Sequence, residues 1–394
     1  MNEHVQHDRA DRRRHGGRGR RGLAAAMASL AVGVVAASAV APTAAFAGGR
    51  PDSVQSSLNA LVKDDGMPAA LASVKGRDGR TRTYTAGVGD LATGARVPVD
   101  GQIRAGSNTK AFTAVVVLQL VAEGKVGLDS PVDTYLPGLL RGDGIDGRAI
   151  TVRQLLQHTS GLPDYMEDPA VSDFAAIQYH YFEPRDLLDG ALAQKARFPA
   201  GTEWEYSNTN YIVAGLLVQK VTGRPVGEEI TKRVIDRIGL RHTYFPTPGD
   251  MSIHEAHPHG YYRSSPDAAP VDYTEADSSA AWATGAIVST NTDLNAFYAS
   301  LIGGRLLPAA QLAEMRTTVP AELLGPGVRY GLGLQSKPLS CGGVLWGHGG
   351  TTASYRSRNG VTDDGRAAAI TVTTIPGAVA AQHMADALDA ALCR

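Results

Sequence analysis

The sequence predicts an α+β fold in which one antiparallel sheet is flanked by N- and C-terminal helices and an all-helical lobe is inserted into the chain. Strand patterns lie near both ends of the sequence, helical patterns fill the middle, and 394 residues are enough for two lobes. We expect the α/β lobe to comprise residues 48–130 and 315–394, and the mainly helical lobe residues 131–314.

The first 47 residues are typical of an export signal. An arginine-rich segment, 12–21, runs directly into an apolar, alanine-rich stretch, 23–40, and the small residues of 45–47 (A-F-A) fit a signal peptidase. We predict a signal peptide over 1–47 and a secreted protein, exported by the general or the twin-arginine route. A membrane anchor is the less favoured alternative, because Gly33 interrupts the stretch, and we expect no stable membrane span in the mature chain.

Periodicity assigns the elements of each lobe. Helical spacing at 54–62 precedes two alternating segments, 69–74 and 81–86, that predict a β-hairpin. The segment 110–123 is apolar on nearly every side, which predicts a helix at the centre of the protein. The other expected elements are helices at 151–157, 210–221 and 227–238, strands at 330–335, 344–348, 354–358 and 367–374, and a closing helix at 379–392.

Charge and cysteine content narrow the function classes. The chain carries 38 basic and 39 acidic side chains, a balance that gives no reason to expect a nucleic-acid partner. Its two cysteines, Cys341 and Cys393, would meet oxidising conditions in an exported protein, so we expect them to form one disulfide. Two buried thiols are the alternative.

The tetrad Ser107-Asn108-Thr109-Lys110 is the first candidate catalytic motif. Ser107 precedes the central helix, near unpaired backbone N–H groups, and Lys110 lies one turn deeper on the same face. Burial would lower the pKa of Lys110 so that its amine can take the proton of Ser107. The structural alternative is a helix-capping serine and a surface lysine.

Tyr206 and Asn208 form a second candidate motif at the start of a predicted helix. A phenol held beside a lysine ammonium can be partly ionised and relay protons, while an asparagine amide can bind a substrate carbonyl and the lysine together. Taken alone, the pair is better explained as an Asn cap and a core tyrosine.

A third motif, His348-Gly349-Gly350-Thr351, follows an apolar strand. Its glycines leave the strand edge open to a substrate backbone, so the N–H groups of Thr351 and Ser107 could form an oxyanion hole. In isolation, the motif is better explained as a glycine-rich turn with an incidental histidine.

Together, S-x-x-K, Y-x-N and H-x-G resemble the motifs of the penicillin-recognising serine enzymes, the superfamily of serine β-lactamases and D-alanyl-D-alanine carboxypeptidases. Their order, spacing and expected elements agree, and the resemblance covers essentially all of the mature chain. Further segments fit it: 158–162 (H-T-S-G-L), 206–211 (Y-S-N-T-N-Y), and Trp282 with Gly285. The likeness is strongest to the soluble actinobacterial carboxypeptidases, and it implies a β-lactamase/transpeptidase-like fold.

The resemblance implies a catalytic set and a reaction. Ser107 would attack the carbonyl before a terminal D-alanine, Lys110 and Tyr206 would move the proton, and water or an amine would release the acyl group. No metal or cofactor would be required. The expected partner of this presumed monomeric enzyme is a small peptide ending in D-Ala-D-Ala, or a β-lactam, bound by Asn208, His348, Gly350, Thr351 and Trp282.

The chain departs from the resemblance at two positions, of which the second concerns the substrate carboxylate. Gly349 stands where the related enzymes carry a threonine, and Gln335 stands where they place an arginine. Without a cation, the carboxylate would lose a charge-assisted hydrogen bond. Lys337, two residues along and therefore on the same face of the strand, could replace that cation.

Other functions are less well supported. The segment 254–259 holds three histidines and a glutamate, but Pro258 and Gly260 disfavour the helix that a zinc site with histidines four apart needs. The chain has no G-x-S-x-G motif, which argues against an α/β-hydrolase. Within the resembling fold, a class C-like β-lactamase, an esterase and a catalytically silent penicillin- or wall-binding protein remain open.

Overall fold

A computed structural model describes residues 52–265 and 267–394 of the protein. The predicted signal peptide, residues 1–47, lies outside these residues. Within them, no helix has the length and apolar character needed to cross a membrane.

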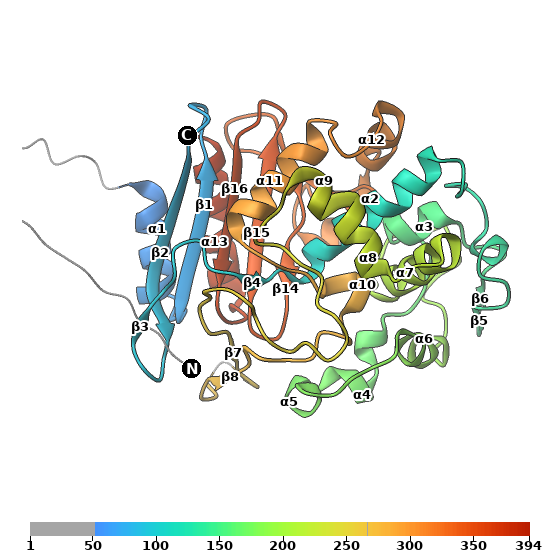
Figure 1. The fold of residues 1–394 in the computed structure, drawn as a ribbon, viewed down its shortest axis with the longest axis horizontal. Coiled ribbons are helices and arrows are strands. Elements are labelled where there is room, and N and C mark those ends of the chain that lie inside the picture. Colours follow the sequence, from blue (N-terminus) through green and yellow to red (C-terminus); the bar gives the residue numbers. More distant parts are fainter. Residues whose placement is uncertain (1–51, 266) are drawn as a thin grey trace, which may run out of the picture. The chain divides into compact units, whose positions relative to one another are not determined.

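A ten-stranded antiparallel sheet forms the α/β lobe, in the order β10-β11-β12-β13-β15-β16-β1-β2-β3, with β14 paired to β15. β1 (Ala69–Lys75) lies between β2 (Thr81–Asp90) and β16 (Ala367–Val372), so strands from the two ends of the sequence lie side by side (Figure 1). The other strands of the sheet are β3 (Ala95–Arg96), β10 (Val319–Pro320), β11 (Arg329–Tyr330), β12 (Gln335–Pro338), β13 (Val344–Gly347), β14 (Gly350–Thr351) and β15 (Arg356–Thr362).

Two terminal helices cover one face of this sheet. α1 (Ser53–Lys63) and α13 (Ala378–Leu392) share an apolar core with alternate residues of β1 and β16. This arrangement follows from the alternation of side chains along a strand, which turns every second residue toward the helices. The expected α+β fold is therefore confirmed.

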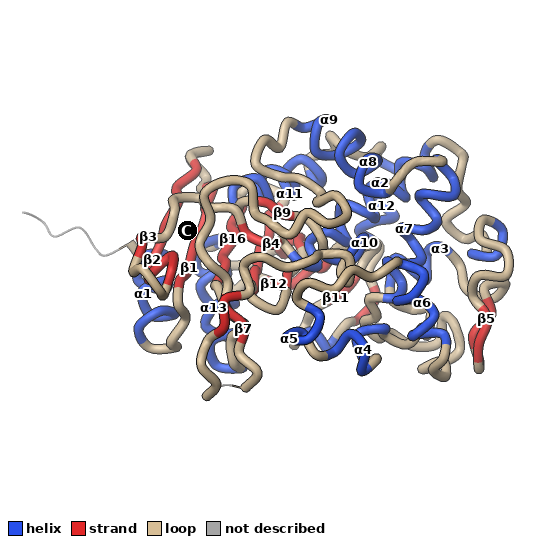
Figure 2. The backbone as a smooth tube through the Cα atoms, turned by 60° about the horizontal axis from the view of Figure 1, so that its bottom comes forward, coloured by secondary structure: helices blue, strands red, loops and turns tan. Residues whose placement is uncertain are grey.

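The helical lobe occupies the middle of the chain, and Figure 2 shows its helices gathered on one side and most strands on the other. α7 (Thr209–Thr222) packs against α2 (Thr109–Ala122) at its centre. The surrounding helices are α3 (Val152–Gln157), α4 (Pro169–Ser172), α5 (Phe174–Ile177), α6 (Pro184–Leu192), α8 (Val226–Ile230), α9 (Asp236–Ile238), α10 (Trp282–Gly285) and α12 (Ala309–Arg316). Short strand pairs join β4 (Ile103–Arg104) to β9 (Val288–Ser289), β5 (Arg141–Gly142) to β6 (Ile145–Asp146), and β7 (Tyr261–Tyr262) to β8 (Val271–Asp272).

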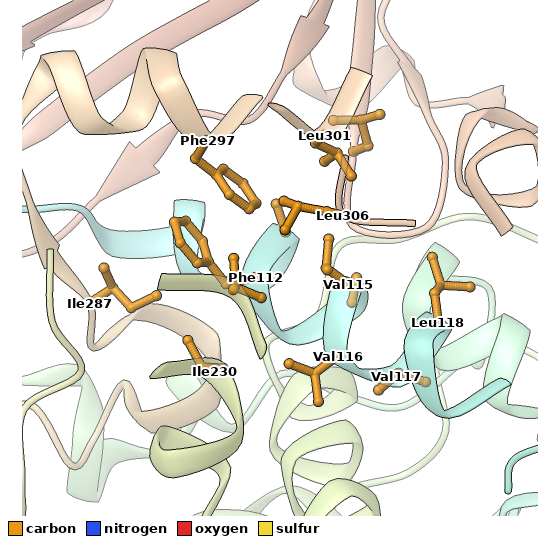
Figure 3. Close-up of a cluster of buried hydrophobic side chains, with 14 of the residues drawn as sticks. Phe112, Val115, Val116, Val117, Leu118, Ile230, Ile287, Phe297, Leu301 and Leu306 are labelled. Carbon is orange, nitrogen blue, oxygen red and sulfur yellow. The ribbon is translucent and has the colours of Figure 1, made fainter. Parts of the chain in front are cut away.

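Helix α2 is enclosed by the rest of the protein, as its all-round apolar sequence predicts. Every residue from Thr109 to Leu120 is buried, and Figure 3 shows Val115 to Leu118 pointing to different sides of the helix. The Phe112 ring stacks on Phe297 of α11 (Asn291–Ile302), with ring centroids 3.7 Å apart. Because α2 is held on all sides, the residues at its N-terminus have a fixed position.

Helix α11 departs from the expected division into lobes. It lies within residues 131–314 but packs on the sheet, opposite the terminal helices. Its Asn291 donates a hydrogen bond to Leu71 O at 3.2 Å and accepts one from Thr371 Oγ1 at 2.7 Å. The boundary therefore differs from the prediction, because a helix contributed by the middle of the chain covers the inner face of the sheet.

The late strands differ from the sequence prediction in two places. The single strand expected at 330–335 is instead the end of β11, a tight turn and the first residue of β12. Gly333 in this turn has a φ of +74°, a conformation that favours glycine. The strand expected at 354–358 is β15, which begins at Arg356 and continues to Thr362.

The predicted disulfide is present. Cys341, in the turn between β12 and β13, is bonded to Cys393 at the end of α13. The bond joins the terminal helix to the sheet.

Candidate active site

Ser107 lies in a single 3-10 turn (Gly106–Asn108) that leads directly into α2. Gly106 has a φ of +55°, and a methyl group there would lie 2.8 Å from Thr351 N, so this turn and β14 are in close backbone contact. Asn108 locks the turn: its buried amide donates to Ser357 Oγ at 2.9 Å and accepts from Tyr298 OH at 2.9 Å. Sequence reasoning had assigned no role to Asn108.

Two proton-carrying groups contact the Ser107 hydroxyl. Lys110 Nζ lies 3.1 Å from Ser107 Oγ, and Tyr206 OH lies 2.9 Å from it on a different element. Lys110 is fully buried, so the alternative of a surface lysine is wrong. Burial lowers the pKa of Lys110 to about 7, because an ammonium without water is destabilised. A substantial fraction of the amine is then neutral near neutral pH and able to accept the serine proton.

Asn208 holds Lys110 from the start of α7. Lys110 Nζ donates to Asn208 Oδ1 at 2.7 Å and to Thr284 O at 3.0 Å. The other end of the Asn208 amide, Nδ2, donates to Asp164 Oδ2 at 2.8 Å. Sequence reasoning missed Asp164 and Thr284, since no spacing rule links them to the tetrad.

Tyr206 is a neutral phenol, which corrects the expectation of a partly ionised one. Burial raises its pKa well above the usual value, because a phenolate would lose its hydration. Its O–H therefore acts as a donor to Ser107 Oγ and can deliver a proton.

His348 is also neutral. Burial, with a smaller effect of the Lys110 charge, lowers its pKa to about 3. Its Nε2 lies 2.9 Å from Tyr330 OH, which is 3.1 Å from His158 Nε2, and its Nδ1 lies 2.6 Å from Gly349 O. His348 thus belongs to a buried hydrogen-bond chain and does not supply the site with a positive charge.

Gly350 and Thr351 bring β14 against the serine turn. A methyl group on Gly350 would lie 2.0 Å from Ala105 O, a contact that only glycine permits. Thr351 is paired with Arg356 of β15, and its backbone adjoins Gly106, immediately before Ser107. The motif is therefore placed beside the candidate nucleophile, as the oxyanion-hole interpretation requires.

Trp282 does not face this site. Its indole packs on α7, where a methyl group on Gly215 would lie 2.6 Å from the ring. The indole lines a separate cavity of about 890 Å³ with Phe245 and Glu228. We therefore correct the prediction that Trp282 binds substrate: in this structure it supports the helix that carries Asn208.

A cavity of about 440 Å³ opens over Ser107. Lys337 is not among its lining residues, so the structure does not support Lys337 as the substitute cation, whereas Gln335 does line it. Among its lining residues are Ser107, Tyr206, Asn208, His348 and Thr351 from the motifs, the aromatic residues Tyr165, Phe174 and Tyr273, and the cations Arg104, Arg356 and Arg358.

Arg356 and Arg358 are the cations that sequence reasoning missed. They alternate along β15 and so share one face, and Arg356 donates to Thr351 Oγ1 on the neighbouring β14. In the described part of the chain, the Nε atom of each is buried without a hydrogen-bond partner. Arg104 differs, since its guanidinium donates to the carbonyl oxygens of Thr274 and Met251.

The histidines of 254–259 do not surround a common centre: His257 stacks on His259, with ring centroids 6.0 Å apart, while His254 stacks on Tyr244. His254 pairs with Asp250 at 2.7 Å, and His259 pairs with Asp272 at 2.6 Å. Among residues 52–265 and 267–394, no group of three or more His, Cys, Asp or Glu side chains is arranged to hold a metal ion.

Comparisons with known proteins agree with this geometry. Residues 54–392 match the family model described as Beta-lactamase. A crystal structure of a D-stereospecific amidohydrolase from Streptomyces sp. is 40% identical, with a TM-score of 0.79 over 86% of this chain and 98% of that one.

Two curated relatives match over shorter lengths. Protein flp from Staphylococcus aureus is 32% identical over 38% of this chain and 29% of its own length. Penicillin-binding protein 4 from Amycolatopsis lactamdurans is 28% identical over 55% of each. The chain thus aligns with about a third to a half of these relatives. With the fold and the family match over nearly all described residues, the chain belongs to the Beta-lactamase family of serine hydrolases, the penicillin-recognising superfamily.

Proposed function

We propose that this protein hydrolyses peptide-like amide bonds at D-amino acid residues through an acyl-enzyme on Ser107, and that it acts as a D-alanyl-D-alanine carboxypeptidase. The observation that carries the chemistry is the position of Ser107 Oγ, in contact with both the buried Lys110 amine and the Tyr206 phenol. A nucleophile with two proton-carrying neighbours suits acyl transfer without a histidine base.

The geometry suggests a sequence of proton transfers. Neutral Lys110 takes the proton of Ser107 as Oγ attacks the substrate carbonyl, and the backbone N–H groups of Ser107 and Thr351 stabilise the oxyanion. Tyr206 then gives its proton to the leaving amine and is reprotonated from Lys110, so the site ends with a Ser107 ester and both groups in their starting states. Deacylation runs these proton transfers in reverse, with a water molecule in the place of the amine. It releases the acid and restores Ser107.

The choice of substrate rests on two supports. The Streptomyces relative is described as D-stereospecific, which supports a D residue on the acyl side. Arg356 and Arg358 both line the cavity, and the buried Nε atom of each has no hydrogen-bond partner in the described chain. These two cations support a carboxylate on the leaving residue. We further propose that the protein works outside the cytoplasm, on wall-like peptides, as its leader predicts.

An amidase of D-amino acid amides is the second candidate, favoured by the likeness to the Streptomyces amidohydrolase. β-Lactamase and esterase activities of the same site would use the same acyl-enzyme. Turnover of a D-Ala-D-Ala peptide, a D-amino acid amide, a chromogenic cephalosporin and a short acyl ester would separate these activities. A carboxypeptidase should have a kcat/KM for the D-Ala-D-Ala peptide at least tenfold higher than for each of the other three substrates.

The mechanism predicts that Ser107→Ala abolishes acylation and leaves the fold intact. Ser107 lies inside the 3-10 turn and caps neither this turn nor α2, so its replacement removes no helix cap, while no other group can replace the nucleophile. Labelling with a fluorescent penicillin, followed by mass spectrometry of the adduct, measures the effect. Turnover by Ser107→Ala would contradict the mechanism, and a wild-type protein that forms no adduct and turns over none of the four substrates would be the silent binder.

A further inference from the structure

Asp164, on the loop before α4, is connected to Lys110 through the side chain of Asn208. Asp164 Oδ2 accepts hydrogen bonds from Asn208 N at 3.1 Å and Asn208 Nδ2 at 2.8 Å, and Oδ1 accepts one from Met166 N at 3.1 Å. All three partners are N–H donors, which a carboxylate satisfies as an acceptor. We propose that Asp164 is a positioning residue that orients Asn208 and controls the protonation of Lys110, an inference that rests on the proposed Ser107 mechanism.

The orientation of Asn208 follows from hydrogen-bond chemistry. An ionised carboxylate can only accept, so it requires the NH₂ end of the amide on its own side. The carbonyl end then faces Lys110, where Oδ1 accepts from Nζ at 2.7 Å. If Asp164 could also donate, the amide could turn over and present two N–H donors to the lysine ammonium. The carboxylate removes that second arrangement.

The charges around Lys110 make Asp164 its counter-ion. Tyr206 and Tyr211 place their rings 5.0 and 5.6 Å from Nζ, and burial raises the pKa of both phenols so that they stay neutral. Burial lowers the pKa of His158 and His348, which also stay neutral. The cation Arg356 lies farther out on β15, against Thr351.

Asp164 is thus the anion that opposes the effect of burial on Lys110. Burial lowers the pKa of Lys110, and the Asp164 charge raises it. Burial also raises the pKa of Asp164, and its N–H donors and Lys110 oppose that rise. The two charges stabilise each other across the Asn208 amide.

A substitution that removes the charge of Asp164 should change the pKa of Lys110 in one direction. Removing the negative charge disfavours the ammonium, so the pKa of Lys110 falls and the neutral base persists to lower pH. The acidic limb of the acylation profile therefore moves to lower pH. The plateau rate also falls, because Asn208 loses its fixed orientation.

The test is the pH dependence of the acylation rate constant with a fluorescent penicillin, for wild type and Asp164→Asn. We expect the acidic limb to move down by about one pH unit, the low end of the effect of a nearby opposite charge. Glu167→Gln is the matched control: it removes an exposed carboxylate three residues away, paired with Arg197, and should leave the limb unchanged. A uniform loss of rate with an unmoved limb would show that Asp164 only caps its loop.

Two further measurements test the role of Asp164 even if Asp164→Asn does not fold or turnover cannot be measured. If Asp164→Asn does not fold, Asp164→Glu and Asp164→Gln are equal in size and differ in charge, so the limb should lie lower in the Gln variant. The NMR titration of ¹³C-labelled lysine, with Lys110 assigned by Lys110→Arg, reads the protonation without turnover. A wild type that is never acylated would refute the proposed function, while an unmoved Lys110 titration in Asp164→Asn would refute this inference.

Discussion

At the scale of single residues, Arg356 and Arg358 give the cavity over Ser107 an excess of positive charge. Their partly buried guanidinium groups have unpaired Nε atoms among the described residues, and burial lowers the pKa of both. A buried cation without an anionic partner is costly. A bound carboxylate would supply that partner, which explains how a chain with Gln335 could still recognise a free acid.

This explanation predicts that Arg356→Gln lowers kcat/KM for a free-acid peptide by about tenfold, since a charged hydrogen bond exceeds a neutral one by roughly 1.4 kcal/mol. The matching amide substrate should be nearly unaffected. Lys337→Gln, which removes a cation from β12 that does not line the cavity, is the control. Equal losses for acid and amide would place the carboxylate elsewhere and favour the amidase candidate.

The residues that could be predicted are those whose motifs are local. Ser107 and Lys110 are one helical turn apart, so the tetrad alone indicates their contact. Asp164 contacts Asn208 from 44 positions away, and only the folded chain brings them together. The ionisation of Tyr206 was mispredicted for the same reason: its pKa depends on burial by distant elements, which a motif does not report.

At the scale of elements, the backbone contact between the serine turn and β14 determines the geometry of the proposed oxyanion hole. Gly106 and Gly350 form the two sides of this contact, and an added methyl on either would meet backbone atoms of the other segment within 3.0 Å. Because these are backbone atoms, they cannot move aside as the end of a flexible side chain could.

We therefore expect Gly350→Ala to push β14 away and to lower acylation by about 10²-fold, the effect of a displacement of about 1 Å in an active site. Gly349→Ala is the neighbouring control, because its methyl would meet only Ser357 O at 3.4 Å. Acylation rates and circular dichroism of both variants check this. A Gly350→Ala enzyme as fast as Gly349→Ala would contradict the close contact.

The elements that sequence predicted well are those with a strong local period, such as α2 and β1. The prediction of a single strand over 330–335 was wrong because the alternating pattern continues through Gly331 and Gly333. The turn at these residues packs against α2. A methyl group on Gly333 would lie 2.6 Å from Ala114 Cβ. The end of β11 therefore depends on this tertiary contact as well as on the positive φ of Gly333.

At the scale of the whole molecule, the disulfide fastens the end of α13 to the β12–β13 turn. Replacing both Cys341 and Cys393 by serine should lower the free energy of unfolding by about 2–4 kcal/mol, because the unfolded chain regains the freedom of a 52-residue separation. Activity at 25 °C should persist, since neither cysteine lines the cavity. Urea unfolding measures the change, and identical midpoints would show that the bond adds no stability.

The position of β1 in the sheet determines when, during synthesis, the fold can be completed. Ala70 pairs with Val372, so the centre of the sheet stays open until Val372 has been synthesised. At synthesis rates of 5–20 residues per second, the roughly 300 residues between them take about 15–60 s. The Ser107 segment is synthesised early in that interval, and it lacks β14 and β15 until Gly350–Thr351 and Arg356–Thr362 have been made. The site around Ser107 is therefore incomplete, and the nascent protein inactive, until β14 and β15 have been synthesised.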